Sequence, residues 1–374
     1  MPTTHIVRTA VDALVERAQR EIDEGLLPSC QLALALDGEV VEQVTLGDHL
    51  GDDSRYATFS AIKGIVYTAT WQLLAEGSLR LDQRVAELIP AFGTNGKEAV
   101  TVEQLMCHRG GFPLAPLGPP DWSDRAKRLE TFGRWKLTAE PGTYAYHITS
   151  AHWVLAELLE VIDGIDFRES LRRRLFDPLG LKRLELGVPL ERTGDINLAV
   201  SVGEPATAEE FEAAIGVKGV APDTWSDDTA VASAQPEHLA VGMPGGGGVS
   251  TAGDLARFYQ ALLHNPGGLW DPTWLHEGTA VVRVTDFDML FTAPANRTIG
   301  MVVAGDDGRA GARGFGKTNS PQTFGYNGFG GQMAWADPTT GLSFAYLTNG
   351  IDRHLLRQTR RGVGIASRAA ICAA

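Results

Sequence analysis

Two β-type segments at opposite ends of the chain constrain its fold most. Residues 31–47 read QLALALDGEVVEQVTLG, two β-type runs around Asp37-Gly38, a dipeptide typical of two-residue hairpin turns. Residues 331–350 read GQMAWADPTTGLSFAYLTNG, two further strands around an Asp-Pro-Thr-Thr-Gly turn. The chain between these hairpins is mainly helical and loop-rich in pattern. We therefore predict one sheet that is built from both ends of the chain.

Helical patterns flank and separate these strands. Apolar residues at three- and four-residue spacing predict a helix over 6–24, and Ser60 opens a second helix that runs to about Glu76 and ends at Gly77. Thr101 and Gln104 form a capping-box pattern, and the tail from Arg353 to about Ala369 indicates a closing helix. Residues 200–235 read as surface helix and loop.

The fold class that we expect is α+β, an antiparallel sheet flanked by helices. The sheet domain would comprise residues 1–79 together with 295–374, and residues 80–294 would form a mainly helical inserted domain.

Composition excludes several classes of protein. The 374 residues are 44% hydrophobic and 21% charged, as in soluble globular proteins, and no stretch is long and apolar enough to span a membrane. The segment where a signal peptide needs an apolar core is interrupted by the acidic residues Asp12, Glu16 and Glu21. We therefore expect a cytoplasmic location. The formal charge of −13 argues against nucleic acid as a partner.

The cysteines and histidines do not form a metal-binding pattern. Three cysteines lie far apart, so they form neither a disulfide framework nor a CxxC site. His147 and His152 are five residues apart, which does not place two ligands on one helical face. We expect no metal and no cofactor.

A serine and a lysine three residues apart stand at the start of the second helix. The stretch TFSAIKGIVYT, residues 58–68, puts Ser60 and Lys63 on one helical face, within hydrogen-bonding reach of each other. The positive end of the helix dipole disfavours an ammonium group there, so the lysine is easier to use as a base. The backbone N–H of Ser60 also points to where an oxyanion would form. Such a pair occurs often by chance, and its context has to support a catalytic role.

That context is an ordered set of further motifs. After Phe59-Ser60-Ala61-Ile62-Lys63 come GKEAVTVEQLMCHRGGF, EPGTYAYH, FDPLGL, GGGGVSTAGDLARFYQALL and FGYNGFGGQMAWADPTTGLSFAYLTN. In this order the chain resembles the class C β-lactamase-like serine hydrolases, a superfamily that includes family VIII carboxylesterases, D-amino-peptidases and related acyltransferases. The resemblance runs from about residue 5 to the last strand. It implies a β-lactamase/transpeptidase-like fold and an acyl-serine mechanism on Ser60 and Lys63.

The second active-site element of this family is a tyrosine after a Pro-Gly pair. EPGTYAYHITSAHW offers Tyr144 and Tyr146. We favour Tyr146, because Tyr144 occupies the slot that usually varies in the family and Tyr146 lies closer to the next helix. The asparagine usual two residues later is replaced by Ile148.

The third element is a Lys-Thr-Gly or His-x-Gly triplet, and here it reads Tyr326-Asn327-Gly328. By resemblance, these residues would bind substrate, and the N–H of Phe329 would complete the oxyanion hole with that of Ser60. A cation at the first position attracts a substrate carboxylate, whereas a tyrosine brings no charge. We therefore expect a small neutral ester or amide as substrate.

The resulting expectation is a carboxylesterase-type serine hydrolase. Lys63 and Tyr146 would deprotonate Ser60, which attacks the acyl carbonyl, and water would then release the acyl group. Alternatives on the same fold are a β-lactamase, a D-amino-peptidase or amidase, and a catalytically inactive binding protein.

Other features are weaker candidates. Ser250 in GVSTA nearly matches a nucleophile elbow but lacks the last glycine, and Thr251 with Asp254 resembles a helix cap. The glycines from Gly245 lack the lysine of a phosphate loop and would form a wall of the cleft. His108 would make a structural hydrogen bond at a helix end. Two tryptophans would line either an acyl pocket or the core: Trp122 and Trp135.

Overall fold

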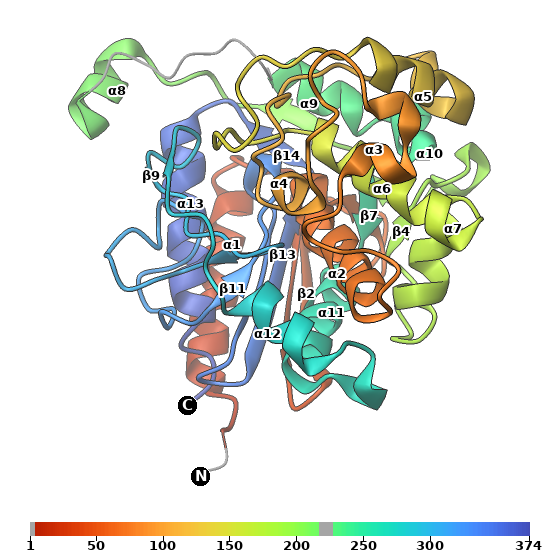
Figure 1. Cartoon of the computed structure of the whole chain (residues 1–374). Coiled ribbons are helices and arrows are strands. Elements are labelled where there is room, and N and C mark those ends of the chain that lie inside the picture. The colour runs from red at the N-terminus through yellow and green to blue at the C-terminus, as the bar shows by residue number, and fades with distance from the viewer. Residues whose placement is uncertain (1–3, 217–226) are drawn as a thin grey trace.

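A six-stranded antiparallel sheet forms the centre of the molecule. The computed structural model describes residues 4–216 and 227–374 (Figure 1). Along the sheet the strand order is β10-β11-β12-β13-β1-β2, so strands from the end of the chain lie beside the first two. Their bounds are Val302–Val303, Phe324–Gly325, Met333–Asp337, Leu342–Thr348, Ser29–Leu36 and Glu39–Gly47. The prediction of one antiparallel sheet from both termini in an α+β fold is confirmed.

The first hairpin turns at the predicted dipeptide. Asp37 has φ +52° and Gly38 has φ +85°, the left-handed pair that a two-residue hairpin turn of this twist requires. On the other side of β1, the register runs from Cys30 opposite Thr348 to Ala35 opposite Ser343. This pairing joins the two ends of the chain in the middle of the sheet.

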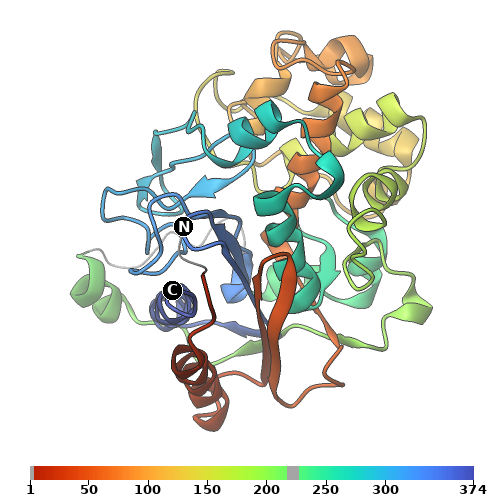
Figure 2. The ribbon, with the colours of Figure 1, turned by 90° about the horizontal axis from the view of Figure 1, so that it is seen from below.

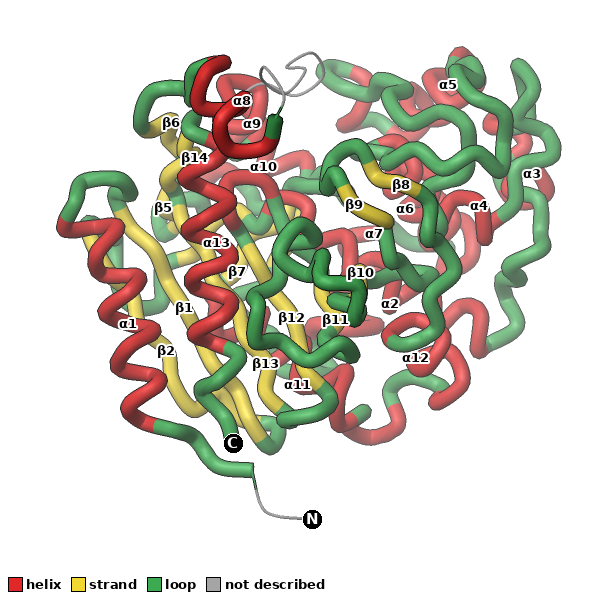
Figure 3. Tube along the Cα trace, turned by 90° about the vertical axis from the view of Figure 1, so that its left-hand side faces the viewer, coloured by secondary structure: helices red, strands yellow, loops and turns green. Residues whose placement is uncertain are grey.

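Helices cover both faces of the sheet, so β1, which lies between β13 and β2, is buried along its whole length. Cys30, Leu32 and Leu34 pack in one cluster with α1 (Arg8–Asp23) and α13 (Leu355–Ala369), which lie side by side across the sheet in Figure 3. The small Ala33 and Ala35 face the opposite cluster, where α11 (Ala252–His264) packs on β1 and β13, as the view from below in Figure 2 also shows.

Helix α2 (Ile62–Ala75) lies inside the protein. It follows a 3₁₀ turn at Phe59–Ala61, and every residue from Ile62 to Leu74 is buried. A helix that is buried on all sides needs apolar residues all round, which explains why this segment has no polar face. Its neighbours are α6 (Ser150–Asp163) and α12 (Pro272–Thr279). The predicted helix from Ser60 to about Glu76 is confirmed.

Shorter elements complete the fold. The other helices are α3 Val85–Leu88, α4 Val102–Met106, α5 Arg125–Arg134, α7 Phe167–Leu171, α8 Ala208–Ile215, α9 Asp227–Ser233 and α10 Pro236–Val241. The capping box at the start of α4 is present as predicted. Short strands pair as β4-β7-β3-β5, β14-β6 and β8-β9. They span Glu185–Leu186, Gly248–Ser250, Arg55–Ala57, Ile196–Asn197, Gly350–Asp352, Val200–Val202, Phe287–Asp288 and Ala293–Pro294.

Two expectations bear on the middle of the chain. The segment 200–235 holds strand β6 besides the helices α8 and α9, and its part 217–226 lies outside the described residues. Helix α11 belongs to the predicted insertion 80–294 and yet packs on the sheet. The division into two domains stays a prediction.

Within the described residues, no helix combines the length and hydropathy needed to cross a membrane. Within the same residues, no group of three or more His, Cys, Asp or Glu side chains could hold a metal ion.

Candidate active site

Ser60 lies in a tight turn between a short strand and the buried helix. Strand β3 ends at Ala57, and the 3₁₀ turn at Phe59–Ala61 leads directly into α2. Phe59 has φ +46°, a strained conformation for a bulky residue that persists only where the surroundings enforce it. Its buried ring packs edge-on against Phe329, with 6.3 Å between ring centroids. Packing therefore fixes the backbone on which Ser60 sits, while Ser60 itself is half-buried.

Lys63 faces Ser60 from the first turn of α2. Its Nζ donates to Ser60 Oγ at 2.9 Å, and the lysine is fully buried. The same Nζ donates to the carbonyl oxygen of Gly245, the first residue of the glycine run expected to form a wall of the cleft. The three-residue spacing thus places the two side chains in contact, and the glycine run supplies a contact that the sequence analysis missed.

Tyr146 completes a cluster with this pair. Its hydroxyl interacts with both Ser60 and Lys63, and the Lys63 Nζ lies 5.7 Å from the centroid of its ring. Tyr144 points to different partners: its hydroxyl donates to Asp288 and accepts a hydrogen bond from Arg297 Nε at 3.0 Å. The structure therefore brings Tyr146, and not Tyr144, to Ser60 and Lys63.

The segment 326–329 lies against the turn that carries Ser60. A Cβ added to Gly328 would lie 2.3 Å from the carbonyl oxygen of Thr58, so only glycine fits there. Asn327 Nδ2 donates to the carbonyl oxygen of Gly314 at 3.0 Å and so holds a neighbouring loop. Tyr326 is buried and its hydroxyl donates to that of Tyr146 at 3.4 Å. The predicted third element is therefore adjacent to the first two.

A cation lies at this corner of the site, contrary to the expectation that Tyr326 leaves it uncharged. Arg297 donates from Nη1 to the Tyr326 hydroxyl at 3.3 Å, and its Cζ lies 4.9 Å from the centroid of the Tyr146 ring. Arg297 is 3% exposed and forms an ion pair with buried Asp288 at 3.3 Å. It comes from a segment without helical or strand periodicity, so no local pattern marks it in the sequence.

The charges in this cluster favour a shared proton between Lys63 and Tyr146. Burial lowers the pKa of Lys63, and the charge of Arg297 acts in the same direction. Burial alone would raise the pKa of Tyr146, but the charges of Lys63 and Arg297 outweigh it, so that this pKa falls below its ordinary value. A neutral lysine or a tyrosinate can each accept the proton of Ser60, and the two groups titrate as one pair.

Two neutral histidines, His108 and His152, lie against the cluster of Ser60, Lys63 and Tyr146. Burial lowers the pKa of His108 and of His152 well below the ordinary value. His108 Nδ1 accepts a hydrogen bond from the backbone N–H of His147, while its Nε2 faces the hydroxyls of Tyr67 and Tyr326, each at 3.3 Å. His108 thus makes the predicted structural hydrogen bond and also contacts the tyrosines of the site.

The weaker candidates lie in structural positions. Ser250 is fully buried in β7, and its hydroxyl donates to the carbonyl oxygen of Thr251. The side-chain Oγ1 of Thr251 caps α11 by accepting a hydrogen bond from the N–H of Asp254. Trp122 and Trp135 belong to the main hydrophobic core.

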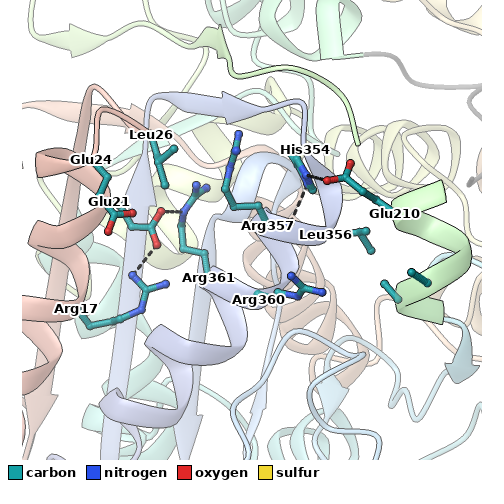
Figure 4. Close-up of a pocket in the computed structure, with 12 residues that line it drawn as sticks. Arg17, Glu21, Glu24, Leu26, Glu210, His354, Leu356, Arg357, Arg360 and Arg361 are labelled. Atoms are coloured by element: carbon teal, nitrogen blue, oxygen red, sulfur yellow. Dashed lines mark hydrogen bonds and ion pairs between the residues drawn. The ribbon is translucent and has the colours of Figure 1, made fainter. Parts of the chain in front are cut away.

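A hollow shown in Figure 4 lies apart from this cluster, between α1, α8 and α13. Most of the side chains that line it are polar or charged, and several of them pair. Arg361 binds Glu21 at 2.6 Å, and His354 faces Glu210 at 3.5 Å. None of the lining residues belongs to the cluster around Ser60. We assign no role to this hollow.

Comparisons with known proteins identify the family and the fold. The family model described as Beta-lactamase matches residues 10–363. A curated relative, "Esterase/beta-lactamase LipL" of Mycobacterium tuberculosis, is 30% identical over 351 residues, which cover 89% of this chain and 80% of the relative.

Two solved structures share the fold over nearly the whole chain. A penicillin-binding protein homologue from Caulobacter crescentus superposes with a TM-score of 0.79 at 25% identity, covering 98% of this chain and 99% of the other. A family VIII carboxylesterase superposes with a TM-score of 0.76 at 21% identity and the same coverage.

Proposed function

The chain belongs to the β-lactamase family of serine hydrolases, and we propose that within this family it is a carboxylesterase acting through an acyl-Ser60 intermediate. The observation that supports this most is the contact of Ser60 Oγ with Lys63 Nζ at 2.9 Å, beside the hydroxyl of Tyr146. A nucleophile, a buried base and a second proton carrier are the groups that acyl transfer needs.

The proposed reaction has two halves. As the Ser60 oxygen attacks the acyl carbon, its proton passes to the Lys63–Tyr146 pair. The carbonyl oxygen gains the electron pair and is held by the N–H groups of Ser60 and Phe329. The pair then protonates the leaving alcohol through Tyr146. In the second half, water attacks the acyl carbon and gives its proton to the pair, and the pair returns a proton to the Ser60 oxygen as the acid leaves.

The surroundings of Tyr326 support a neutral substrate. A family member with a lysine or histidine at this position can present a cation to a substrate carboxylate. Here the nearby cation is Arg297, which is 3% exposed and turned toward tyrosine hydroxyls and Asp288. A small neutral ester or amide would meet the site without leaving a carboxylate unpaired.

The alternatives use the same groups. LipL of M. tuberculosis carries both esterase and β-lactamase in its name, so a β-lactamase is the main competing assignment. A D-amino-peptidase or amidase, or an inactive binding homologue, would keep the same fold. The cytoplasmic location expected from the sequence stays a prediction.

A comparison of substrates tests the proposal. Purified protein is assayed on short p-nitrophenyl esters, on a chromogenic cephalosporin and on a D-amino acid amide. Ser60→Ala removes the proposed nucleophile. Ser250→Ala serves as a matched control, because its hydroxyl donates to the Thr251 carbonyl instead.

We expect ester turnover that Ser60→Ala abolishes and Ser250→Ala retains. Ester turnover that survives Ser60→Ala would contradict the mechanism. Faster turnover of the cephalosporin or the amide than of any ester would replace the carboxylesterase assignment by the corresponding alternative. Folded protein without turnover of any of the three would favour a binding homologue.

A further inference from the structure

Arg297 is held in a fixed place by its backbone. Its N–H donates to the carbonyl of Val284 at 3.0 Å, and its own carbonyl accepts from the N–H groups of Arg283 and Val284 at 2.8 and 3.0 Å. It also bridges to Val302 at the start of β10, on the edge of the central sheet. The guanidinium therefore enters the site from a supported segment rather than from a free loop.

The guanidinium contacts three tyrosines and one carboxylate. Nε donates to Tyr144 at 3.0 Å, Nη1 to Tyr326 at 3.3 Å and Nη2 to Asp288 at 3.3 Å. Its Cζ lies over the ring of Tyr146, 4.9 Å from the ring centroid. A guanidinium keeps its charge in proteins, so a fixed positive charge stands beside Tyr146 in a buried environment.

Asp288 is the carboxylate that faces this charge, at a relatively long distance. The carboxylate also accepts hydrogen bonds from the Tyr144 hydroxyl and from the backbone N–H of Leu290, the latter at 2.8 Å. Its ion pair with Arg297 is longer than a close charge-assisted hydrogen bond of about 2.7–2.9 Å. An anion on the Tyr146 oxygen would be stabilised by this buried cation, which its carboxylate partner holds only at a distance.

The groups that face Tyr146 come from several elements. Lys63 from α2 and Arg297 are the cations, and both lower the pKa of Tyr146 against the effect of burial. The other polar groups near it are neutral or act through Arg297: Ser60, Tyr67, His108, Tyr144, Asp288 and Tyr326. The neutral state of His108 follows from its lowered pKa, so it adds no charge.

From this geometry we infer that Arg297 is a positioning residue for the proposed reaction: its buried charge holds Tyr146 as the proton-accepting partner of Ser60. This inference rests on the proposed function. Arg297 supplies this charge from the strand-edge segment 297–302, whereas the 326–328 triplet supplies none. Because it is 3% exposed, it acts through Tyr146 and not on the substrate.

The proton balance is explicit. The bond from Ser60 Oγ to the acyl carbon forms while the Ser60 proton moves to the Tyr146 oxygen, and the carbonyl electron pair moves to its oxygen. When the bond to the leaving alcohol breaks, the same proton passes from Tyr146 to that alcohol. Arg297 gains and loses no proton in either step.

The test is the dependence of kcat/KM on pH for p-nitrophenyl acetate. Arg297→Gln removes the charge, Arg297→Lys retains it, and Asp288→Asn removes the opposing charge. The acid limb of the profile should move to higher pH in Arg297→Gln, with about a tenfold loss at pH 7 for each pH unit of movement. In Arg297→Lys it should stay near its original place. In Asp288→Asn it should move to lower pH, since the field at Tyr146 becomes more positive.

A matched control separates charge from packing. Arg128 is also a buried arginine, 4% exposed and paired with Glu160 at 2.9 Å, so Arg128→Gln should lower stability without moving the limb. An unmoved limb in folded Arg297→Gln, with activity lost equally at every pH, would overturn the inference. If Arg297→Gln does not fold, a limb that stays in place or moves to higher pH in Asp288→Asn overturns it instead.

A second readout distinguishes this inference from the proposed function. The rate of covalent labelling of Ser60 by a fluorophosphonate is measured over the same pH range. Absence of both labelling and turnover in the unmodified protein would refute the proposed function. Labelling whose pH dependence is the same with and without the Arg297 charge would refute the role of Arg297 alone.

Discussion

Replacing Gly328 by alanine tests the close approach between the segment 326–329 and the turn that carries Ser60. The new Cβ would lie 2.3 Å from the Thr58 carbonyl oxygen, 3.0 Å from Gln332 Cβ and 3.1 Å from Phe59 Cβ. Ordinary contact begins at about 3.4 Å, so the two backbone segments must separate by about 1 Å. Such overpacking costs about 1–3 kcal/mol of stability.

The larger effect should appear in catalysis. Phe329 follows Gly328 directly, and a shift of about 1 Å between its N–H and Ser60 should lower kcat on p-nitrophenyl acetate by about 10²-fold. Urea unfolding of the same preparation separates this loss from unfolding. The matched control is Gly362→Ala in α13, where the nearest atom is Met333 Cε at 3.6 Å and alanine should stabilise the helix by about 0.5–1 kcal/mol. A folded Gly328→Ala variant with unchanged kcat would refute the placement of the oxyanion hole.

Three further predictions concern the tyrosines, the lysine and a buried histidine. Tyr146→Phe should lower kcat/KM by about 10²–10⁴-fold, and Tyr144→Phe by less, because its hydroxyl binds Asp288 and Arg297; equal losses would contradict the assignment. Burial lowers the pKa of Lys63, so kcat/KM should rise with pH through a limb that lies below the ordinary lysine range. Lys63→Met should remove the activity at every pH. Retained activity in this variant would exclude Lys63 as a base. Burial lowers the pKa of His147 to about 4, whereas this histidine titrates near the ordinary value of about 6.5 in the unfolded chain. As pH falls from about 6.5 to about 4, the unfolded chain therefore binds a proton before the folded protein does, and the free energy of unfolding drops by up to about 3 kcal/mol. Urea titrations at pH 7 and pH 5 should show a smaller drop in His147→Gln, and an equal drop would exclude this histidine as the cause.

The parts of the fold that local chemistry determines were predictable. Asp37-Gly38 adopts the two left-handed conformations that its hairpin needs, and the helix that begins after Ser60 runs to Ala75. The contact between Ser60 and Lys63 follows from their spacing, since residues three apart share a face both in the 3₁₀ turn that holds Ser60 and in the α-helix that follows. Apolar runs at both ends of the chain were enough to indicate the central sheet.

The rest depends on pairing between distant segments. Strands β3, β5 and β7 are two or three residues long, too short for any period to appear in the sequence. No periodic pattern in the sequence marks the segment that brings Arg297 beside Tyr326 either, because its place is set by bridges to Val284 and Val302. The third motif itself therefore carries no charge, but the structure places the charge of Arg297 beside its tyrosine.

The central claim is that Ser60 carries the acyl group. The most direct measurement is intact-protein and peptide mass spectrometry after brief reaction with a fluorophosphonate and, separately, with a slowly hydrolysed aryl ester. We expect one added phosphonyl or acyl group, located on the peptide that contains Ser60 and absent from Ser60→Ala. A group located on another residue, such as Ser250, or ester turnover by Ser60→Ala would contradict it.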